Sequence, residues 1–374
     1  MATLNIVERY EEEKERLETQ TISALIFETT NRCKACACPG CYMVVSGRNR
    51  GPLQQFDLQT AKKVIDLVKA HNDGIEAKSL DLIGGEPMGT DCWPVTQAVI
   101  EECLRRGITA WLFTNGVFMT REKAGWLLSR EVPVTMKLNI GGLSDPEQLQ
   151  LQAEMIGKDL TTAQRLVAGL YAALEAGYKA SLLSVENLLR GGKKSNIPYV
   201  PQYYELGLEL GFKPDLELMG NGEPANWGYF DLAPTISQLR WLMTQIGEIH
   251  QKKELATPQF LMPHLLGSCP FYDTALYFCA DGRIQPCSNN RTVLASFNTD
   301  EDPIGTAIRN PVIQARRTLC QEKMQGPCRH CSLWSKCRGG CRATAESFGS
   351  PYLSYPLCPI QTEFDDPRTI LTAR

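Results

Sequence analysis

Residues 21–42, TISALIFETTNRCKACACPGCY, place four cysteines within nine residues, directly after an apolar run. Residues 21–28 are mostly apolar and are bounded by polar residues, a pattern that predicts a β-strand. A loop just past a strand can wrap several thiolates around one metal centre. We therefore expect the fold to be organised around this strand and its cysteine loop, with the rest of the chain positioning the loop.

The composition is that of an ordinary globular protein. The 374 residues are 43% hydrophobic and 22% charged, enough for two domains or for one large domain with an appendage. The formal charge of −3 offers no general attraction to nucleic acid or to an anionic membrane. No apolar run approaches the roughly 18 residues of a membrane span. Residues 1–21 are acidic and helix-prone, unlike a signal peptide, so we expect a cytoplasmic protein.

The fifteen cysteines are concentrated at the two ends of the chain. Four lie in residues 33–41, and most of the others lie between Cys269 and Cys358. The cytoplasm keeps thiols reduced, so this clustering predicts metal sites in preference to structural disulfides. Ligand type alone leaves zinc and iron–sulfur clusters both open, because both use thiolates in paired CxxC units.

Strands alternate with helices through residues 22–254. Six strands, each followed by a helix, imply a parallel sheet that right-handed crossovers curl into a full or partial barrel. Ligands of such folds bind at the C-terminal ends of the strands, where the cysteine loop, GGEP (residues 84–87) and TNG (residues 114–116) are expected. The predicted strands are residues 21–28, 80–83, 108–113, 132–140, 178–185 and 213–219, and the predicted helices are residues 57–70, 95–105, 121–130, 161–176, 198–210 and 235–252.

The GGEP stretch, Gly84 to Pro87, has two interpretations. Paired glycines and a proline make a tight turn at the end of a strand. In a binding site the glycines would expose backbone to a ligand, and the Glu86 carboxylate would hold an ammonium group.

The alternation ends near residue 254, and residues 255–374 are rich in cysteine. Residues 275–287 predict a β-hairpin whose turn is Asp281-Gly282. The cysteines here follow the spacing C-x12-G-x4-C, then C-x2-C-x5-C-x3-C, then a distant C; they are Cys269, Cys287, Cys328, Cys331, Cys337, Cys341 and Cys358.

Together the two ends resemble a radical S-adenosylmethionine (SAM) enzyme with a C-terminal SPASM domain. The family's front motif is CxxxCxxC, and Cys38-Pro-Gly-Cys41-Tyr42 matches its second half. Four residues instead of three separate Cys33 from Cys38, and Cys36 lies in that gap as an alternative first ligand. The resemblance implies that Cys33, Cys38 and Cys41 hold a [4Fe–4S] cluster whose fourth iron binds SAM.

The resemblance also implies the residues that bind SAM. GGEP would bind its amino group, Lys137 its carboxylate and Asn139 its ribose. The full set is Gly84, Gly85, Glu86, Pro87, Tyr42, Lys137, Asn139, Ser184, Asn187 and Arg190.

The C-terminal spacing implies two auxiliary [4Fe–4S] clusters. The first would use Cys269, Cys287 and Cys341, with Cys279 as a plausible fourth ligand or, without it, an open site. The second would use Cys328, Cys331, Cys337 and Cys358.

The implied fold is a partial (β/α)6 TIM-like barrel, residues 22–254, with a SPASM domain at residues 255–374 and a helical arm at residues 1–21. The SPASM domain would be a small β-hairpin, loops and short helices around iron–sulfur clusters. The implied activity is reductive cleavage of SAM to a 5′-deoxyadenosyl radical, which takes a hydrogen atom from an unactivated C–H bond. The implied electron donor is a protein such as flavodoxin or ferredoxin.

The substrate is less defined. Family members commonly oxidise, cross-link or epimerise peptides or proteins, which is the preferred interpretation. A small-molecule dehydrogenase or epimerase, acting on an aminoglycoside, sugar or cofactor precursor, is the alternative, and a non-catalytic zinc module is a remote one. Because about 21 residues are too few for a leader-binding domain, leader recognition would need a separate partner.

Two residues near GGEP are candidate catalytic groups. Cys92 is either a thiol that donates a hydrogen atom to a substrate radical or a small buried hydrophobe. Asp91 is either a base or a helix N-cap. We assign Cys103 and Cys320 to packing.

Overall fold

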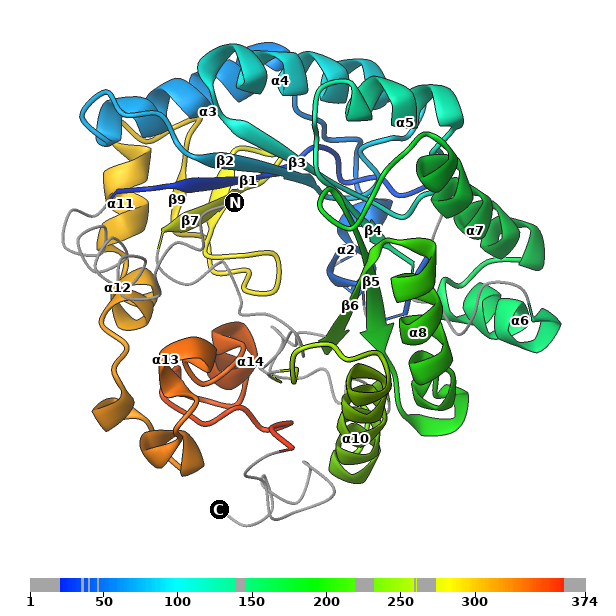
Figure 1. Ribbon diagram of the computed structural model, residues 1–374. Coiled ribbons are helices and arrows are strands. Elements are labelled where there is room, and N and C mark those ends of the chain that lie inside the picture. The colour runs from blue at the N-terminus through cyan, green and yellow to red at the C-terminus, as the bar shows by residue number, and fades with distance from the viewer. Residues whose placement is uncertain are drawn as a thin grey trace.

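The computed structural model describes residues 21–34, 37–39, 41–45, 47–138, 145–218, 232–258, 260 and 274–359. Six parallel strands stand side by side in chain order and curl into a partial barrel, with helices around the outside (Figure 1). The strands are β1 (Ala24–Glu28), β2 (Ser79–Ile83), β3 (Thr109–Thr114), β4 (Val134–Lys137), β5 (Leu183–Leu189) and β6 (Lys213–Leu218). The helices of this part are α2 (Tyr42–Val45), α3 (Leu58–His71), α4 (Trp93–Arg106), α5 (Arg121–Leu128), α6 (Pro146–Met155), α7 (Leu160–Glu175), α8 (Val200–Leu210) and α10 (Ile236–Lys252), with 3-10 turns η1 (Arg48–Arg50), η2 (Gly192–Lys194) and η3 (Ile197–Tyr199).

Each barrel strand turns one face to the helices and the other to the interior. On β2, Leu80 and Leu82 are fully buried in the main core, which they share with Val64 of α3 and Ile100 of α4. Because side chains alternate along a strand, Asp81 lies on the inner face. The inner faces of the neighbouring strands also carry charged residues: Glu28, Lys137, Glu186 and Glu217.

Local capping explains where the predicted helices begin. The Asp57 carboxylate accepts a hydrogen bond from the Thr60 N–H at the start of α3, as predicted. Thr235 and Gln238 form a capping box at the start of α10. Helix α6 was not predicted, because its apolar residues alternate with polar ones instead of recurring at helical spacing.

The predicted fifth strand, residues 178–185, was misplaced. Strand β5 runs from Leu183 to Leu189, and the backbone turns just before it, with the Leu182 N–H bonded to the Lys179 carbonyl at 2.9 Å. Tyr178 is buried and its hydroxyl donates to the Val132 carbonyl at 2.8 Å. The apolar residues at 178–185 therefore reflect burial of a turn as well as of a strand. Strand β4 is also shorter than the predicted residues 132–140.

The predicted hairpin is confirmed and extends the barrel sheet. It consists of β7 (Ala275–Phe278) and β8 (Arg283–Gln285), joined at Gly282, whose φ of 96° suits glycine. A short strand, β9 (Ala295–Ser296), pairs with β8. Strand β7 runs parallel to β1, with Ala24 opposite Ala275, so the order is β6-β5-β4-β3-β2-β1-β7-β8-β9.

The segment after the hairpin wraps around the same core. Its Ile304, Ile308 and Tyr355 belong to the cluster of buried residues that also contains the barrel strands. Figure 1 shows these elements facing the open side of the barrel. They are α11 (Pro303–Arg309), α12 (Pro311–Arg317), η4 (Gln321–Lys323), η5 (Pro327–His330), α13 (Trp334–Cys337) and α14 (Arg342–Ser347).

Several predictions fall on residues outside the described part of the chain: the arm at residues 1–20, Cys36, Asn139 and Cys269. Within the described residues, no helix combines the length and the apolar character that crossing a bilayer requires.

Candidate active site

The cysteine loop leaves the end of β1 and is held over the C-terminal ends of the strands. The Gly85 N–H donates to the Thr30 carbonyl at 2.7 Å, which ties the loop to the turn after β2. The Arg32 guanidinium donates to two backbone carbonyls of residues 49–51, at 2.5 and 2.6 Å. The Ala37 N–H donates to the carbonyl that follows α6 at 2.8 Å. Three separate segments therefore fix the path of the loop.

The three predicted ligands of the front cluster lie near enough to influence one another, although not close enough to hold a single metal ion. The Cys41 N–H donates to the Cys38 carbonyl at 3.1 Å, in a turn through Pro39. Burial, with smaller contributions from the neighbouring Cys38 and Cys33 thiols, raises the pKa of the Cys41 thiol to about 11. The Asn115 side-chain N–H, from the TNG stretch after β3, lies 3.5 Å from Cys33 Sγ. A metal would deprotonate these thiols, since coordination overrides a raised pKa.

Arg190 lies directly after β5 and faces the cysteine loop. It is 4% exposed, and its Nη2 donates to the Pro39 carbonyl at 2.9 Å. Its Nε is buried and has no hydrogen-bond partner. Burial lowers the pKa of Arg190, whereas charge on Cys38 and Cys41 raises it. A buried guanidinium with an unused donor beside three thiols suits an anionic group such as a carboxylate.

Ser184 and Asn187 lie inside strand β5, and not after it at the end of the sheet that carries the cysteine loop. Ser184 is the second residue of β5, about 16 Å before the strand's end at the usual rise per residue. Asn187 is fully buried, and its side-chain oxygen accepts a hydrogen bond from Asn196 at 2.9 Å. Of the three residues predicted after the fifth strand, Arg190 contacts the cysteine loop.

Glu86 holds the turn after β2 to the end of β3. Its carboxylate accepts hydrogen bonds from Thr114 Oγ1 at 2.6 Å, the Asn115 N–H at 2.8 Å and the Met88 N–H at 3.0 Å. Burial raises the pKa of Glu86, and these hydrogen bonds lower it. Glu86 is 2% exposed, so water does not compete for these hydrogen bonds, and they hold Asn115 in position. Binding of the SAM amino group by this element stays a prediction.

The glycines of the turn allow close backbone contact with the cysteine loop. Gly84 has a φ of 123°, which side-chain-bearing residues rarely adopt, and a Cβ there would lie 2.7 Å from the Thr30 carbonyl oxygen. The Tyr42 hydroxyl lies 3.4 Å from the Gly84 carbonyl oxygen. Burial raises the pKa of Tyr42 well above its ordinary value, so this hydroxyl stays protonated.

Lys137 ends β4 on the inner face and is half-exposed. Its ammonium lies 2.8 Å from a Glu186 oxygen and 3.6 Å from a Glu217 oxygen. Burial lowers the pKa of Lys137, but these two carboxylates outweigh it and raise the pKa. The charge of Lys137 is thus already balanced by the protein, and its contact with the SAM carboxylate stays a prediction.

Asp91 and Cys92 lie between the GGEP turn and α4. A helix N-cap was one of the two roles predicted for Asp91. That prediction is wrong, because Cys92 is the N-cap residue of α4. The exposed Asp91 carboxylate instead pairs with Lys34 of the cysteine loop, which lowers the pKa of Asp91. Cys92 is 5% exposed and burial raises the pKa of its thiol, so it is neutral. Both catalytic assignments stay predictions.

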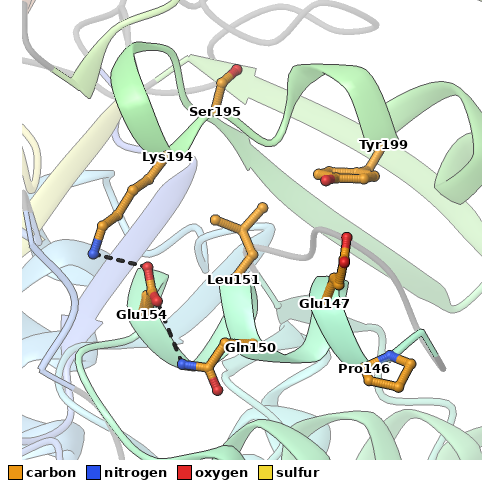
Figure 2. A pocket seen from close by; sticks show the side chains of 8 residues that line it. All are labelled: Pro146, Glu147, Gln150, Leu151, Glu154, Lys194, Ser195 and Tyr199. Carbon is orange, nitrogen blue, oxygen red and sulfur yellow. Dashed lines mark hydrogen bonds and ion pairs between the residues drawn. The ribbon is translucent and has the colours of Figure 1, made fainter.

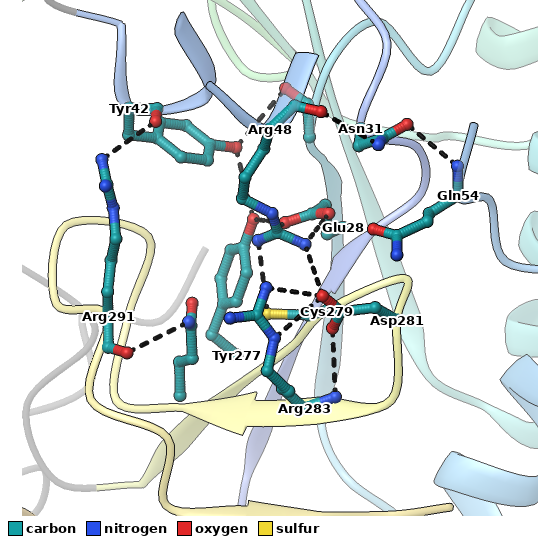
Figure 3. A network of polar contacts seen from close by, with 12 residues as sticks. Glu28, Asn31, Tyr42, Arg48, Gln54, Tyr277, Cys279, Asp281, Arg283 and Arg291 are labelled. Atoms are coloured by element: carbon teal, nitrogen blue, oxygen red, sulfur yellow. Dashed lines mark hydrogen bonds and ion pairs between the residues drawn. The ribbon is translucent and has the colours of Figure 1, made fainter. Parts of the chain in front are cut away.

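A buried ion pair joins the end of β1 to the segment after the cysteine loop (Figure 3). The Glu28 carboxylate is fully buried and binds the Arg48 guanidinium through both oxygens, at 2.5 and 2.6 Å. Burial raises the pKa of Glu28 to about 7, although the Arg48 charge and a hydrogen bond from Tyr277 lower it. The Arg48 side chain is 13% exposed, although the stretch around it is polar and basic in sequence.

The same network reaches the hairpin. The Tyr277 hydroxyl of β7 donates to Glu28 at 2.9 Å and lies 3.4 Å from the Tyr42 hydroxyl. Arg48 also lies 3.5 Å from the Asp281 carboxylate and 3.5 Å from Cys279 Sγ. Figure 3 shows Arg48 between the two segments. The front loop and the cysteine-rich region are therefore joined through charged side chains.

Cys287 and Cys341, two predicted ligands of the first auxiliary cluster, lie close together. Both are buried, and burial, with the charge of Cys287, raises the pKa of the Cys341 thiol. Arg316 is 3% exposed, lies 3.9 Å from Cys287 Sγ and pairs with Glu346 at 2.8 Å. A buried cation beside the thiols suits a negatively charged cluster.

The hairpin register separates Cys279 from Cys287. The Cys279 N–H donates to the Arg283 carbonyl at 2.8 Å, and Tyr277 is opposite Gln285. Cys287 is four residues beyond Arg283, roughly 13 Å along an extended strand. The Cys279 thiol contacts Arg48 on the barrel side instead.

We therefore expect Cys279→Ala to retain the iron content of the wild-type protein, because Cys279 lies too far from Cys287 to share its cluster. Cys287→Ala should lose about four irons, one cluster. Anaerobic reconstitution followed by iron analysis measures both. Loss of four irons in Cys279→Ala would instead support Cys279 as the fourth ligand.

The predicted ligands of the second auxiliary cluster lie on adjoining loops. The Gln321 side chain donates to the carbonyls of Cys328 at 3.3 Å and Cys331 at 2.9 Å. The Cys328 N–H donates to Ser354 Oγ at 2.9 Å, which brings the segment leading to Cys358 beside this turn. No disulfide joins cysteines of the described residues. No three His, Cys, Asp or Glu side chains there converge on a single metal ion.

A surface pocket lies outside the barrel, between α6 and the turns after β5 (Figure 2). At one side Lys194 pairs with Glu154 at 2.8 Å, and Leu151 and Tyr199 supply apolar surface. None of its lining residues is a predicted site residue. They are Pro146, Glu147, Gln150, Leu151, Glu154, Lys194, Ser195 and Tyr199.

Sequence reasoning missed the site roles of Glu28, Arg48, Asn115 and Tyr277. Asn115 follows a predicted strand, so its position alone was a signal. Arg48 and Tyr277 carry no such signal, because only the pairing of β7 with β1 brings them to Glu28.

No protein-family model matches the sequence, and no curated protein matches it. Solved structures of the same fold do. Streptococcus suis SuiB bound to S-adenosylmethionine has 15% identity and a TM-score of 0.63, over 94% of this chain and 81% of SuiB. SuiB bound to precursor peptide SuiA has 15% identity and a TM-score of 0.65, over 96% and 82%. Native anSMEcpe with bound AdoMet has 13% identity and a TM-score of 0.63, over 88% and 92%.

At these identities the likeness establishes the fold. The partial α/β barrel predicted from the alternation of strands and helices is thereby confirmed.

Proposed function

We propose that this chain is a radical SAM enzyme that cleaves SAM reductively and modifies a peptide or protein substrate. The observation that supports the proposal is the position of the buried Arg190 guanidinium beside Cys38 and Cys41, which Cys33 adjoins. When bound, SAM and a four-iron cluster supply a radical that removes a hydrogen atom from the substrate.

The chain's own residues hold and surround these groups. The three cysteine thiolates would hold the cluster, and the Gly84–Gly85 turn would let backbone approach SAM closely. The buried Nε of Arg190, which has no partner among the described residues, would donate to the SAM carboxylate alongside Lys137. Asn115 donates to the Cys33 sulfur, and hydrogen bonds to sulfur ligands tune a cluster's reduction potential. The barrel interior aligns the substrate, since misplacement of reacting atoms is costly.

The C-terminal cysteines extend the proposal to three [4Fe–4S] clusters. The proximity of Cys287 to Cys341, and of the Cys328 turn to the segment before Cys358, supports two auxiliary sites. The cysteines of these two sites would hold clusters that can accept the electron a substrate radical gives up, and the proposed electron donor to the front site is a flavodoxin or ferredoxin.

The peptide part of the proposal rests on structures of the same fold. SuiB has been solved with precursor peptide SuiA, and anSMEcpe with the Cp18Cys peptide. A small-molecule substrate is the competing outcome.

Anaerobic purification and reconstitution should give a brown protein with about twelve irons, three clusters of four. With dithionite and SAM it should release 5′-deoxyadenosine and methionine, measured by liquid chromatography and mass spectrometry. A colourless protein that binds zinc and leaves SAM intact would overturn the proposal.

A further inference from the structure

Asp81 is an unpaired carboxylate on the inner face of the barrel. It sits on β2 between Leu80 and Leu82, which face the helices. Its neighbours across the sheet are Ile26 on β1 and Trp111 on β3. Among the described residues, its carboxylate has no hydrogen bond or ion pair. Burial raises the pKa of Asp81 to about 7, although Lys137 lowers it.

Trp111 gives Asp81 an aromatic neighbour. It lies between Ala110 and Leu112, which belong to the helix-facing core, so its indole is on the inner face with Asp81. Neighbouring strands are about 4.8 Å apart, so the two side chains adjoin. Trp111 is 38% exposed, and no ring or cation contact to it occurs within the described ranges. An accessible indole beside an unpaired carboxylate is a favourable site for a cation.

The protein's own cations in the interior are held elsewhere. Lys137 is paired with Glu186 and Glu217, at 2.8 and 3.6 Å. Arg48 is bound by Glu28. Within the described residues no cation therefore bonds directly to Asp81, although the Lys137 charge acts on it from a distance.

We propose that Asp81 and Trp111 form a subsite for an alkylammonium or guanidinium group of the substrate. Under the proposed function, on which this rests, that group is a lysine or arginine side chain of a peptide. Asp81 lies three residues before the Gly84 turn, about 10 Å deeper in the barrel. If the peptide backbone binds near the cysteine loop, the aliphatic part of such a side chain would extend over Trp111. Its charged end would then reach Asp81.

The test is calorimetric titration of the reconstituted holoenzyme with SAM at pH 8. The probes are Ac-Gly-Ala-Lys-Ala-Gly-NH2, its norleucine counterpart, and glucosamine as a small amine. The lysine peptide should bind at least tenfold more tightly than the norleucine peptide, given the usual size of charge-assisted and cation–π contacts. Asp81→Asn and Trp111→Leu should each remove this preference. Glu122→Gln, an exposed acid on α5, should keep it.

Equal binding of the lysine and norleucine peptides, or an unchanged preference in Asp81→Asn, would overturn the subsite. Binding of glucosamine alone, with the same dependence on Asp81, would keep the subsite and overturn the peptide assignment. Absence of SAM cleavage would overturn the proposed function, yet the binding preference would remain measurable.

A second measurement separates misfolding from loss of binding. Because the pKa of Asp81 is raised in the folded protein, the folded state keeps a proton that the unfolded chain releases between about pH 4 and pH 7. Wild type should therefore lose stability over this window relative to Asp81→Asn, by a few degrees in Tm. Lys137, Glu186, Glu217 and Glu28 are common to both proteins, so the difference reports Asp81. A difference that does not change over this window would show that the pKa of Asp81 is not raised, and would overturn the desolvated carboxylate that the subsite requires.

Discussion

Cys38→Ala should abolish SAM cleavage, with at least a thousandfold loss of 5′-deoxyadenosine formation, and should lower the iron content by about four of twelve. The reason is geometric. Cys38 lies in the turn with Cys41, and its thiol contributes to the raised pKa of Cys41, so both face one site. Two thiolates do not retain a cluster that needs three. Iron analysis and turnover under dithionite measure the effect.

Cys103→Ala is the matched control. Cys103 is fully buried in α4 and packs in the core, so its loss should cost about 1 kcal/mol of stability and no iron. If Cys38→Ala retained all its iron while Cys103→Ala lost some, the assignment of the front site would be wrong.

The same assay decides the first ligand. Cys33 accepts a hydrogen bond from Asn115 and affects the pKa of Cys41, so Cys33→Ala should behave like Cys38→Ala. Cys36→Ala should keep the cluster. If Cys33→Ala kept the cluster and Cys36→Ala lost it, Cys36 would be the first ligand of the front cluster.

Gly85→Ala should weaken SAM binding and slow SAM cleavage, the latter by about a hundredfold, while the barrel stays folded. A Cβ on Gly85 would lie 1.8 Å from the carbonyl oxygen of Arg32 and 2.1 Å from its carbon. Both are backbone atoms of the residue before Cys33, and they cannot rotate away. The cysteine loop or the turn must therefore move by more than about 1 Å, and a misplacement of that size costs about a hundredfold in rate.

Equilibrium dialysis with labelled SAM measures the binding, and circular dichroism monitors the fold. Gly125→Ala is the control, since a Cβ there meets nothing within 4 Å and α5 gains about 1 kcal/mol of helix propensity. Normal SAM binding by Gly85→Ala would mean that the turn does not border the SAM site.

The sequence by itself determined the fold class and most of the candidate ligands. The spacing of Cys33, Cys38 and Cys41 is local, and so are the period of the helices and the Asp281-Gly282 turn. Such signals depend on neighbours a few residues apart, which the chain displays directly. The confirmed barrel and hairpin follow from them.

Only the tertiary structure decided which of those residues meet. Pairing of β7 with β1 put Tyr277 and Cys279 beside Glu28 and Arg48, over sequence separations that no local pattern records. The late start of β5 moved Ser184 away from the strand ends and left Arg190 at the cysteine loop. Alternation across neighbouring strands placed Asp81 beside Trp111. Strand register and long-range pairing depend on which faces of the strands the whole chain can bury together. The residues around the cysteine loop are therefore set only when the strands have paired.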